Sequence, residues 1–173
     1  GRTILFNKAA DGIFYEDKPS PISKIVPQAD GTWLLVFEDN LSELYSHGGY
    51  PLWIQDEHGV RWTYTYGGLN GTQVQNVTHS SGRSVQFIWV DDELREIRDP
   101  AGNPYRFTYY NQKVEVGLHT LRTVTLPGLP ATTITYHYAG DGGEPAYGGL
   151  TGKSYNGVRY SWFTYVNDRA TSS

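Results

Sequence analysis

Apolar and polar residues alternate along much of this chain, and the alternation predicts short β-strands joined by tight turns. Residues 94–110 show the unit: an aliphatic strand, a turn at 99–102, and a returning strand that carries Tyr105, Phe107 and Tyr109 at alternate positions. Side chains two residues apart in a strand share one face of a sheet, so we expect these three rings side by side. The unit is predicted to be a β-hairpin.

The turn at 99–102 has a suitable residue at each key position. Asp99 at the first position of a type I turn can accept backbone hydrogen bonds, and Pro100 presets φ at the second. Gly102 at the fourth position tolerates the positive φ that lets the chain re-enter the sheet. Since one hairpin alone is marginal in water, the number of copies decides whether this pattern describes a fold.

Copies of the unit recur along the chain, and three of them are regular. In these three the last aromatic residue lies seven positions beyond the turn glycine, at residues 66, 89 and 109, which is typical of a structural repeat. The residues predicted to shape the turns are Gly31, Asp56, Gly59, Gly82, Asp99, Pro100, Gly102, Gly128 and Gly157. The residues predicted to form a ladder of aromatic rings are Trp62, Tyr64, Tyr66, Phe87, Trp89, Tyr105, Phe107, Tyr109, Tyr136, Tyr138, Tyr160 and Trp162.

The first part of the chain fits the repeat less well. Hairpins are predicted around the turns 9–12 and 28–31, both of which end in glycine. Residues 40–49 are predicted to be a connection with only a brief strand at Leu44 and Tyr45.

The last part of the chain also drifts from the repeat. Tyr160 and Trp162 follow one alternation and Phe163 the other, which predicts a β-bulge between Trp162 and Phe163. Ser154 is predicted to hold the turn position that Asp99 holds in the regular copy, and residues 140–145 are predicted to be a loop.

Composition favours the same architecture. Gly 20, Pro 9, Tyr 14 and Trp 5 in 173 residues suit many short strands and turns, and no stretch has sustained helical spacing of apolar residues. We therefore expect one all-β domain, a curved antiparallel array of β-hairpins over residues 1–173. Residues 1–49 would form the less regular hairpins and residues 50–173 the regular repeats. The lack of any methionine suggests that the sequence is a fragment of a larger protein.

Charge and cysteine content exclude some functions. A net charge of −4 with scattered basic residues argues against nucleic acid, which needs a concentrated positive surface. No apolar run is long enough for a membrane span, and the absence of cysteine excludes disulfides and thiolate metal sites.

Candidate catalytic groups are each better explained by structure. The five histidines show no metal-binding spacing, and Ser81 before Gly82 lacks the strand-to-helix turn of a nucleophile elbow. The acidic run 91–93 is expected to be solvated, and the glycine-rich stretch 67–71 to be a hairpin connection. We expect no enzyme activity, no catalytic residue, no metal and no cofactor.

The repeated pattern resembles a known family. An aliphatic residue, two spacers, Ile or Val, a turn of the form Asp-x-x-Gly and an aromatic strand ending in Tyr are similar to the Rhs (rearrangement hotspot) or YD-repeat family. The most similar stretches are residues 83–87, 102–109 and 156–160, and the resemblance covers about residues 25 to 173. The chain departs from the family at 91–94, where Gly-Arg-Leu is often found, and at Asp168, where Gly is expected.

This resemblance implies a structural role in a bacterial protein. Rhs repeats form a strip of hairpins that spirals into a hollow shell, and the shell encloses a C-terminal toxin until delivery, often by type VI secretion. The implied partners are the rest of the chain's own shell and the enclosed toxin domain, and the implied location is secreted or at the cell surface. Asp99 and Pro100 share letters with the family's self-cleavage motif, but theirs is one turn among several, so we interpret them as structural.

The aromatic ladder supports an alternative function. Exposed Trp and Tyr rings could stack on sugars, so the chain could instead be a carbohydrate-binding surface of a secreted or cell-wall-associated protein. We favour packing between hairpins, because the alternation recurs in every copy and each ring pairs across strands.

Overall fold

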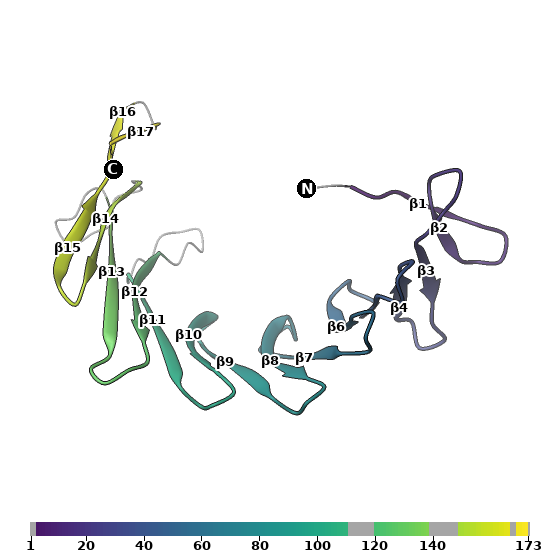
Figure 1. The fold of residues 1–173 in the computed structure, drawn as a ribbon, viewed down its shortest axis with the longest axis horizontal. Coiled ribbons are helices and arrows are strands. Elements are labelled where there is room, and N and C mark those ends of the chain that lie inside the picture. The colour runs from purple at the N-terminus through teal and green to yellow at the C-terminus, as the bar shows by residue number, and fades with distance from the viewer. Residues whose placement is uncertain (1–2, 111–119, 139–148, 167–168, 173) are drawn as a thin grey trace. The chain divides into compact units, whose positions relative to one another are not determined.

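The computed structural model describes residues 3–110, 120–138, 149–166 and 169–172. Within these residues the protein is all-β, with no helix, as the sequence predicts (Figure 1). Fifteen strands form one open antiparallel sheet in which each strand pairs with its neighbours in sequence, and two further strands form a small second sheet.

The strands are short, and most hairpin arms have four to seven residues. Their bounds are β1 Phe6–Lys8, β2 Phe14–Glu16, β3 Lys24–Pro27, β4 Trp33–Val36, β5 Ser42–Tyr45, β6 Pro51–Gln55, β7 Arg61–Gly67, β8 Gln73–His79, β9 Ser84–Val90, β10 Glu93–Arg98, β11 Pro104–Tyr109, β12 Leu121–Leu126, β13 Thr132–Tyr138, β14 Leu150–Tyr155, β15 Val158–Trp162, β16 Thr164–Val166 and β17 Arg169–Ser172. Contacts divide the chain into two units, residues 1–86 and residues 87–173.

One turn design recurs six times in the described residues. The backbone N–H of its first residue donates to the carbonyl of the fifth, and the N–H of the glycine at its fourth position donates to the carbonyl of the first. All six glycines have φ between +80° and +86°. The turns are 9–12, 28–31, 46–49, 56–59, 79–82 and 99–102.

The side chain at the first position of these turns often accepts backbone hydrogen bonds. Asp99 Oδ1 accepts the N–H groups of Ala101 and Asn103, both at 2.9 Å. Nδ1 of His79 likewise accepts a hydrogen bond from the N–H of Ser81, at 3.1 Å. Ser46, Asp56, His79 and Asp99 are therefore interchangeable at this position because each supplies an acceptor, as the sequence predicts for Asp56 and Asp99.

The prediction for residues 40–49 is wrong. This segment contains β5, a full strand that pairs with β4 on one side and β6 on the other. It is followed by a turn of the recurring design, in which Ser46 Oγ accepts the Tyr50 N–H at 3.1 Å. Asn40 ends the preceding turn with φ of +57°, a left-handed conformation that Asn tolerates better than most residues. Residues 40–49 are therefore part of the hairpin array and not a connection outside it.

Two predictions near the other end of the chain are also wrong. The strand β15 ends at Trp162 and the next strand, β16, pairs with β17 in the second sheet, so Trp162 and Phe163 do not flank a bulge in one strand. The bulge lies earlier, where Tyr160 is skipped between Arg159 and Ser161 in the pairing with β14. Ser154 is a buried residue of β14 and not a turn residue.

That bulge separates two residues of the predicted ladder. Tyr160 stacks on Tyr155, with ring centroids 4.5 Å apart, whereas Trp162 lies opposite Gly152, on the other face. The two-residue turn beside them, Asn156 and Gly157, has φ of +45° and +84° and forms the predicted hairpin. The predicted loop 140–145 lies outside the described residues.

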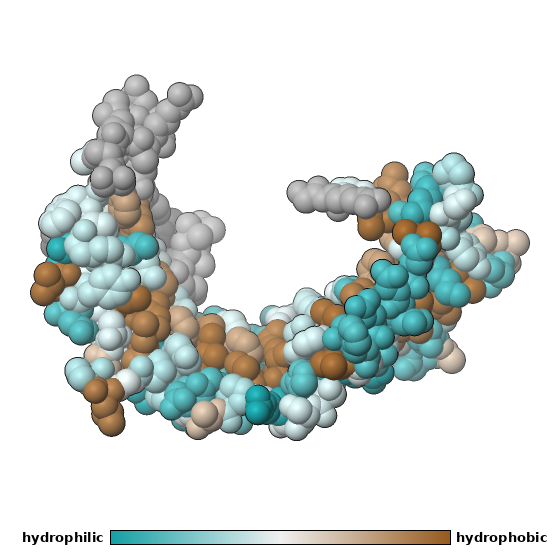
Figure 2. All heavy atoms as spheres, in the orientation of Figure 1, coloured by the Kyte–Doolittle hydropathy of each residue, from teal (hydrophilic) through white to brown (hydrophobic). Residues whose placement is uncertain are grey.

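The described residues form a single layer and enclose no hydrophobic core. No apolar side chain among them is buried, and the buried residues with polar side chains are Glu16, Ser23 and Ser154. Figure 2 shows hydrophobic side chains lying open at the surface instead of enclosed. Apolar contact is therefore made mainly between neighbouring strands.

The turn glycines provide a test of this architecture. A Cβ at Gly102 would meet nothing within 4 Å, so Gly102→Ala adds backbone strain alone. We expect this change to lower the free energy of unfolding by about 1–2 kcal/mol, because a left-handed backbone is unfavourable for residues with a Cβ. Gly102→Asn should cost clearly less, and equal losses for Ala and Asn in denaturant unfolding would contradict the explanation.

Candidate functional site

Cross-strand register gathers many of the aromatic rings on one face of each unit, although Trp53 lies on the opposite face with Leu44 and Thr63. In residues 1–86 a row crosses the sheet through Phe14, Ile25, Leu35, Glu43, Ile54 and Trp62. In residues 87–173 a comparable row crosses through Phe107, Val124 and Ile134. We call the face that holds each row the aromatic face of that unit.

In residues 87–173 the opposite face is more polar, with hydroxyl groups paired across strands. Thr108 and Thr123 lie 2.6 Å apart through their Oγ1 atoms, and Thr125 and Thr133 lie 3.2 Å apart. Each sheet face thus has its own chemistry, which is what strict alternation along a strand produces.

Three tyrosines of the predicted ladder form a repeated hydrogen bond. The hydroxyl of each donates to a backbone carbonyl near the start of the neighbouring strand in the same hairpin. The bonds are Tyr66 to Pro51 at 2.7 Å, Tyr109 to Leu94 at 2.9 Å and Tyr138 to Leu121 at 3.0 Å. We call Tyr66, Tyr109 and Tyr138 the latch tyrosines.

Each latch tyrosine also marks a shift of register with the strand that follows. Thr65 pairs with Asn76 but Tyr66 pairs with Val74, so Gln75 is the extra residue of a β-bulge. The same shift occurs at Tyr109 and at Tyr138. One tyrosine therefore holds the end of its own hairpin by its hydroxyl and meets the next strand at a bulge.

The environment of the latch tyrosines favours their neutral form. Partial burial raises the pKa of Tyr66, Tyr109 and Tyr138 above the usual value of tyrosine, with burial the main cause in all three. A neutral phenol keeps the proton that the bond to the carbonyl requires. Of the three regular copies, the middle one has Trp89 at this position, and tryptophan has no hydroxyl group.

The predicted ladder thus includes three tyrosines whose hydroxyl groups bind backbone carbonyls, a role that the sequence did not reveal. The spacing of seven residues after the turn glycine was the available signal, because it singles out Tyr66 and Tyr109. Their partners are carbonyl groups, which leave no mark in the sequence. The other predicted rings of the ladder are half-buried by cross-strand neighbours, except Tyr160 and Trp162, which are 47% and 58% exposed.

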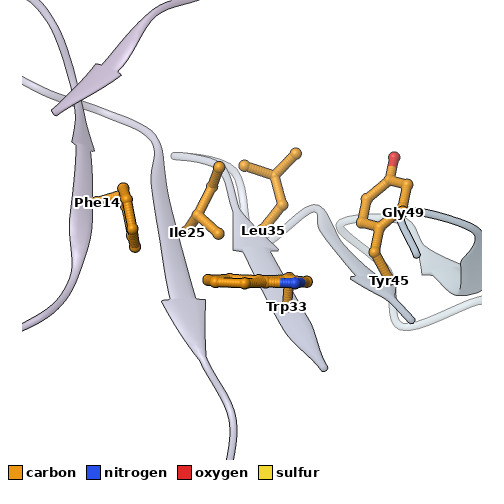
Figure 3. Close-up of a pocket in the computed structure, with 6 residues that line it drawn as sticks. All are labelled: Phe14, Ile25, Trp33, Leu35, Tyr45 and Gly49. Carbon is orange, nitrogen blue, oxygen red and sulfur yellow. The ribbon is translucent and has the colours of Figure 1, made fainter. Parts of the chain in front are cut away.

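A shallow apolar pocket lies on the aromatic face of residues 1–86. Its volume is about 310 Å³, and Figure 3 shows the side chains that surround it. Phe14 meets Trp33 edge-on, with ring centroids 5.9 Å apart, and Tyr45 lies opposite Trp33 in the sheet. The lining is apolar side-chain surface, and the residues that form it are Phe14, Ile25, Trp33, Leu35, Tyr45 and Gly49.

A carboxylate stands at the edge of this pocket. The Tyr45 hydroxyl donates to Glu43 Oε2 at 2.6 Å. Burial, with this bond and the negative charge, raises the pKa of Tyr45 to about 12. Glu43 forms no ion pair with any other described residue.

One serine and one histidine come together in residues 87–173 without making an evident active site. A ring nitrogen of His137 lies 2.6 Å from Ser154 Oγ, across β13 and β14. Ser154 is only 4% exposed, so a substrate has little access to its hydroxyl. The pair ties two strands together.

The other candidates for chemistry lie in turns. Asp91 and Asp92 form the turn between β9 and β10, both with positive φ, and His58 is exposed in the turn 56–59. In the part of the chain that the structure describes, no three acidic or histidine side chains gather where they could hold a metal ion. The same part contains no helix of the length and apolarity needed to cross a membrane.

No family model matches this sequence, and no curated protein matches it.

The latch predicts a difference between tyrosines of one strand. Tyr109→Phe should lower the free energy of unfolding by about 1 kcal/mol, because Leu94 loses the donor to its carbonyl. Tyr105, four residues earlier in β11, makes no hydroxyl hydrogen bond within the described residues, so Tyr105→Phe is the matched control. Equal effects of the two substitutions in denaturant unfolding would contradict the latch.

Proposed function

We propose that this chain is a non-enzymatic structural segment of a bacterial Rhs/YD-repeat protein, part of the wall of a β-shell that encloses a C-terminal toxin. The observation that carries the proposal is the recurrence of the hairpin: the same turn closes six hairpins, and a latch tyrosine beside a bulge stands at the open end of three, with both features together in β6–β7 and β10–β11. A unit repeated in this way builds an extended surface instead of a single cleft.

The single layer supports the same role. Because the described residues bury no apolar side chain, both faces of the sheet remain available to other parts of a larger assembly. A wall that separates an enclosed polypeptide from solvent needs such a two-sided sheet. In this role the protein is exported, and its partners are the rest of the shell and the toxin.

Protease protection tests the wall in the protein that carries this chain. If the repeats enclose the segment that follows them, that segment should resist protease while the wall is intact. Replacing the three latch tyrosines together with Phe should loosen the wall and speed cleavage of the enclosed segment by roughly tenfold or more, since each lost bond costs about 1 kcal/mol. The measured quantity is the rate at which the downstream segment is cut.

A matched triple variant controls for the loss of three hydroxyl groups. Tyr64, Tyr105 and Tyr136 lie in the same strands as the latch tyrosines and make no hydroxyl hydrogen bond within the described residues. Replacing these three with Phe should leave the cleavage rate close to that of the wild type. A downstream segment that is cut equally fast with and without the repeats would refute the wall.

The second candidate is a carbohydrate-binding surface, and the exposure of Tyr160 and Trp162 favours it. Aromatic faces open to solvent can stack on sugar rings, and Tyr155 and Tyr160 lie beside each other with ring centroids 4.5 Å apart and ring planes inclined at 39°.

Glycan binding is separable from packing by substitution. If the chain binds glycans through the rings of Tyr155 and Tyr160, Tyr160→Ala should abolish binding to immobilised cell-wall polysaccharide and leave the melting temperature unchanged. If half-buried rings such as Trp62 serve packing, Trp62→Ala should instead lower stability by about 3 kcal/mol. Absence of glycan binding by the wild-type chain would rule out this candidate.

A further inference from the structure

The pocket on the aromatic face of residues 1–86 has the composition of a cation-binding site. Three aromatic rings surround it, and Figure 3 shows Trp33 as a floor with Phe14 and Tyr45 standing on either side. Phe14 is inclined at 78° to Trp33, so the two rings form a corner. Aromatic rings arranged around a space attract cations through the negative potential of their faces.

Charge near the pocket favours a cation over a neutral or anionic ligand. Glu43 lies directly opposite Leu35, which lines the pocket, and it holds the hydroxyl of Tyr45. Glu43 has no cationic partner within the described residues, so its charge is not neutralised by an ion pair there. The carboxylate supplies negative potential without entering the apolar lining.

The apolar lining selects among cations. An ammonium or guanidinium group would leave hydrogen-bond donors unpaired against carbon, which is unfavourable. A quaternary ammonium group carries its charge on methyl-covered nitrogen and has no donors to satisfy. A volume of about 310 Å³ also lies at the small end of the range for ligand pockets.

We propose that Phe14, Trp33 and Tyr45 form a binding site for a quaternary ammonium group of the kind carried by choline. The methyl groups contact the rings and the aliphatic side chains of Ile25 and Leu35, and the positive charge faces Trp33 and Tyr45 with Glu43 nearby. This site does not depend on the wall function, because it uses only contacts within residues 1–86.

The positive charge of Lys8 should weaken binding of another cation at this site. Substitution of Lys8 should therefore change the affinity in the opposite direction from substitution of Glu43. The Lys8 Nζ lies 5.7 Å from the centroid of the Phe14 ring, so one of the three rings already faces a cation. Removing this charge should strengthen binding of a second cation, whereas removing the charge of Glu43 should weaken it.

The experiment is a titration of the wild-type chain with choline chloride, followed by the NMR signal of the Trp33 indole N–H. Ionic strength is held constant with sodium chloride, because salt screens exposed charges. The neutral probe is 3,3-dimethyl-1-butanol, which has the shape of choline without its charge. We expect choline to bind at least about tenfold more tightly than the alcohol.

Four substitutions test which side chains are responsible for choline binding. Trp33→Leu keeps an apolar floor but removes the ring, and it should weaken choline binding by about fivefold or more while binding of the alcohol changes little. Glu43→Gln should weaken choline binding roughly threefold, and Lys8→Ala should strengthen it by a similar factor. Trp62→Leu is the control, because Trp62 lies outside the pocket and packs on His79 at 5.5 Å.

Three outcomes would overturn the proposal. Equal affinity for choline and the alcohol would show a hydrophobic pocket without cation recognition. No shift of the Trp33 signal with choline would show that the site does not bind this group. Binding to phosphatidylcholine vesicles without binding to free choline would place the interaction on the membrane surface instead of in the pocket.

Discussion

Each strand of this sheet packs its side chains mainly against its two neighbours, because the described residues form one layer. Stability then comes from cross-strand pairs, each worth about 0.2–1 kcal/mol, and no central core adds to them. Rows such as Phe107, Val124 and Ile134 are therefore the unit of stabilisation. A fold built on this principle can be extended by repetition, because each hairpin depends mainly on the hairpins beside it.

Such a sheet must fix its register locally. A slip of one residue would move every aromatic ring to the polar face, and no core would resist it. The recurring turn fixes one end of a hairpin through its glycine and its side-chain acceptor, as at Asp99 and Gly102. The latch tyrosine fixes the other end, since the Tyr109 hydroxyl can reach the Leu94 carbonyl in one register only. Turn and latch together do what a buried core does in a two-layer protein.

The sequence predicted those features that are determined by residues adjacent to one another along the chain. The turns 9–12, 28–31, 56–59, 79–82 and 99–102 were predicted, whereas the turn 46–49 after β5 was missed, although Ser46 supplies a side-chain acceptor there. The bulges were missed because an extra residue such as Gln75 looks like any other strand residue. The pocket could not be found from local pattern, since Phe14, Trp33 and Tyr45 meet only through the register of four successive strands.

In the part of the chain that the structure describes, some aromatic rings lie against the chain's own cations, whereas two of the three rings of the pocket do not. Elsewhere the chain often places its own cations on its rings: Arg61 lies 4.0 Å from the centroid of Trp53, and Lys153 lies 5.8 Å from that of Tyr136. Within the described residues no such contact covers Trp33 or Tyr45. A ring that already holds a cation gains little from a second, because like charges repel. Trp33 and Tyr45 therefore remain available to an external cation, and the pocket with Glu43 at its edge distinguishes them from other uncovered rings of the described residues, such as Trp62 and Phe107.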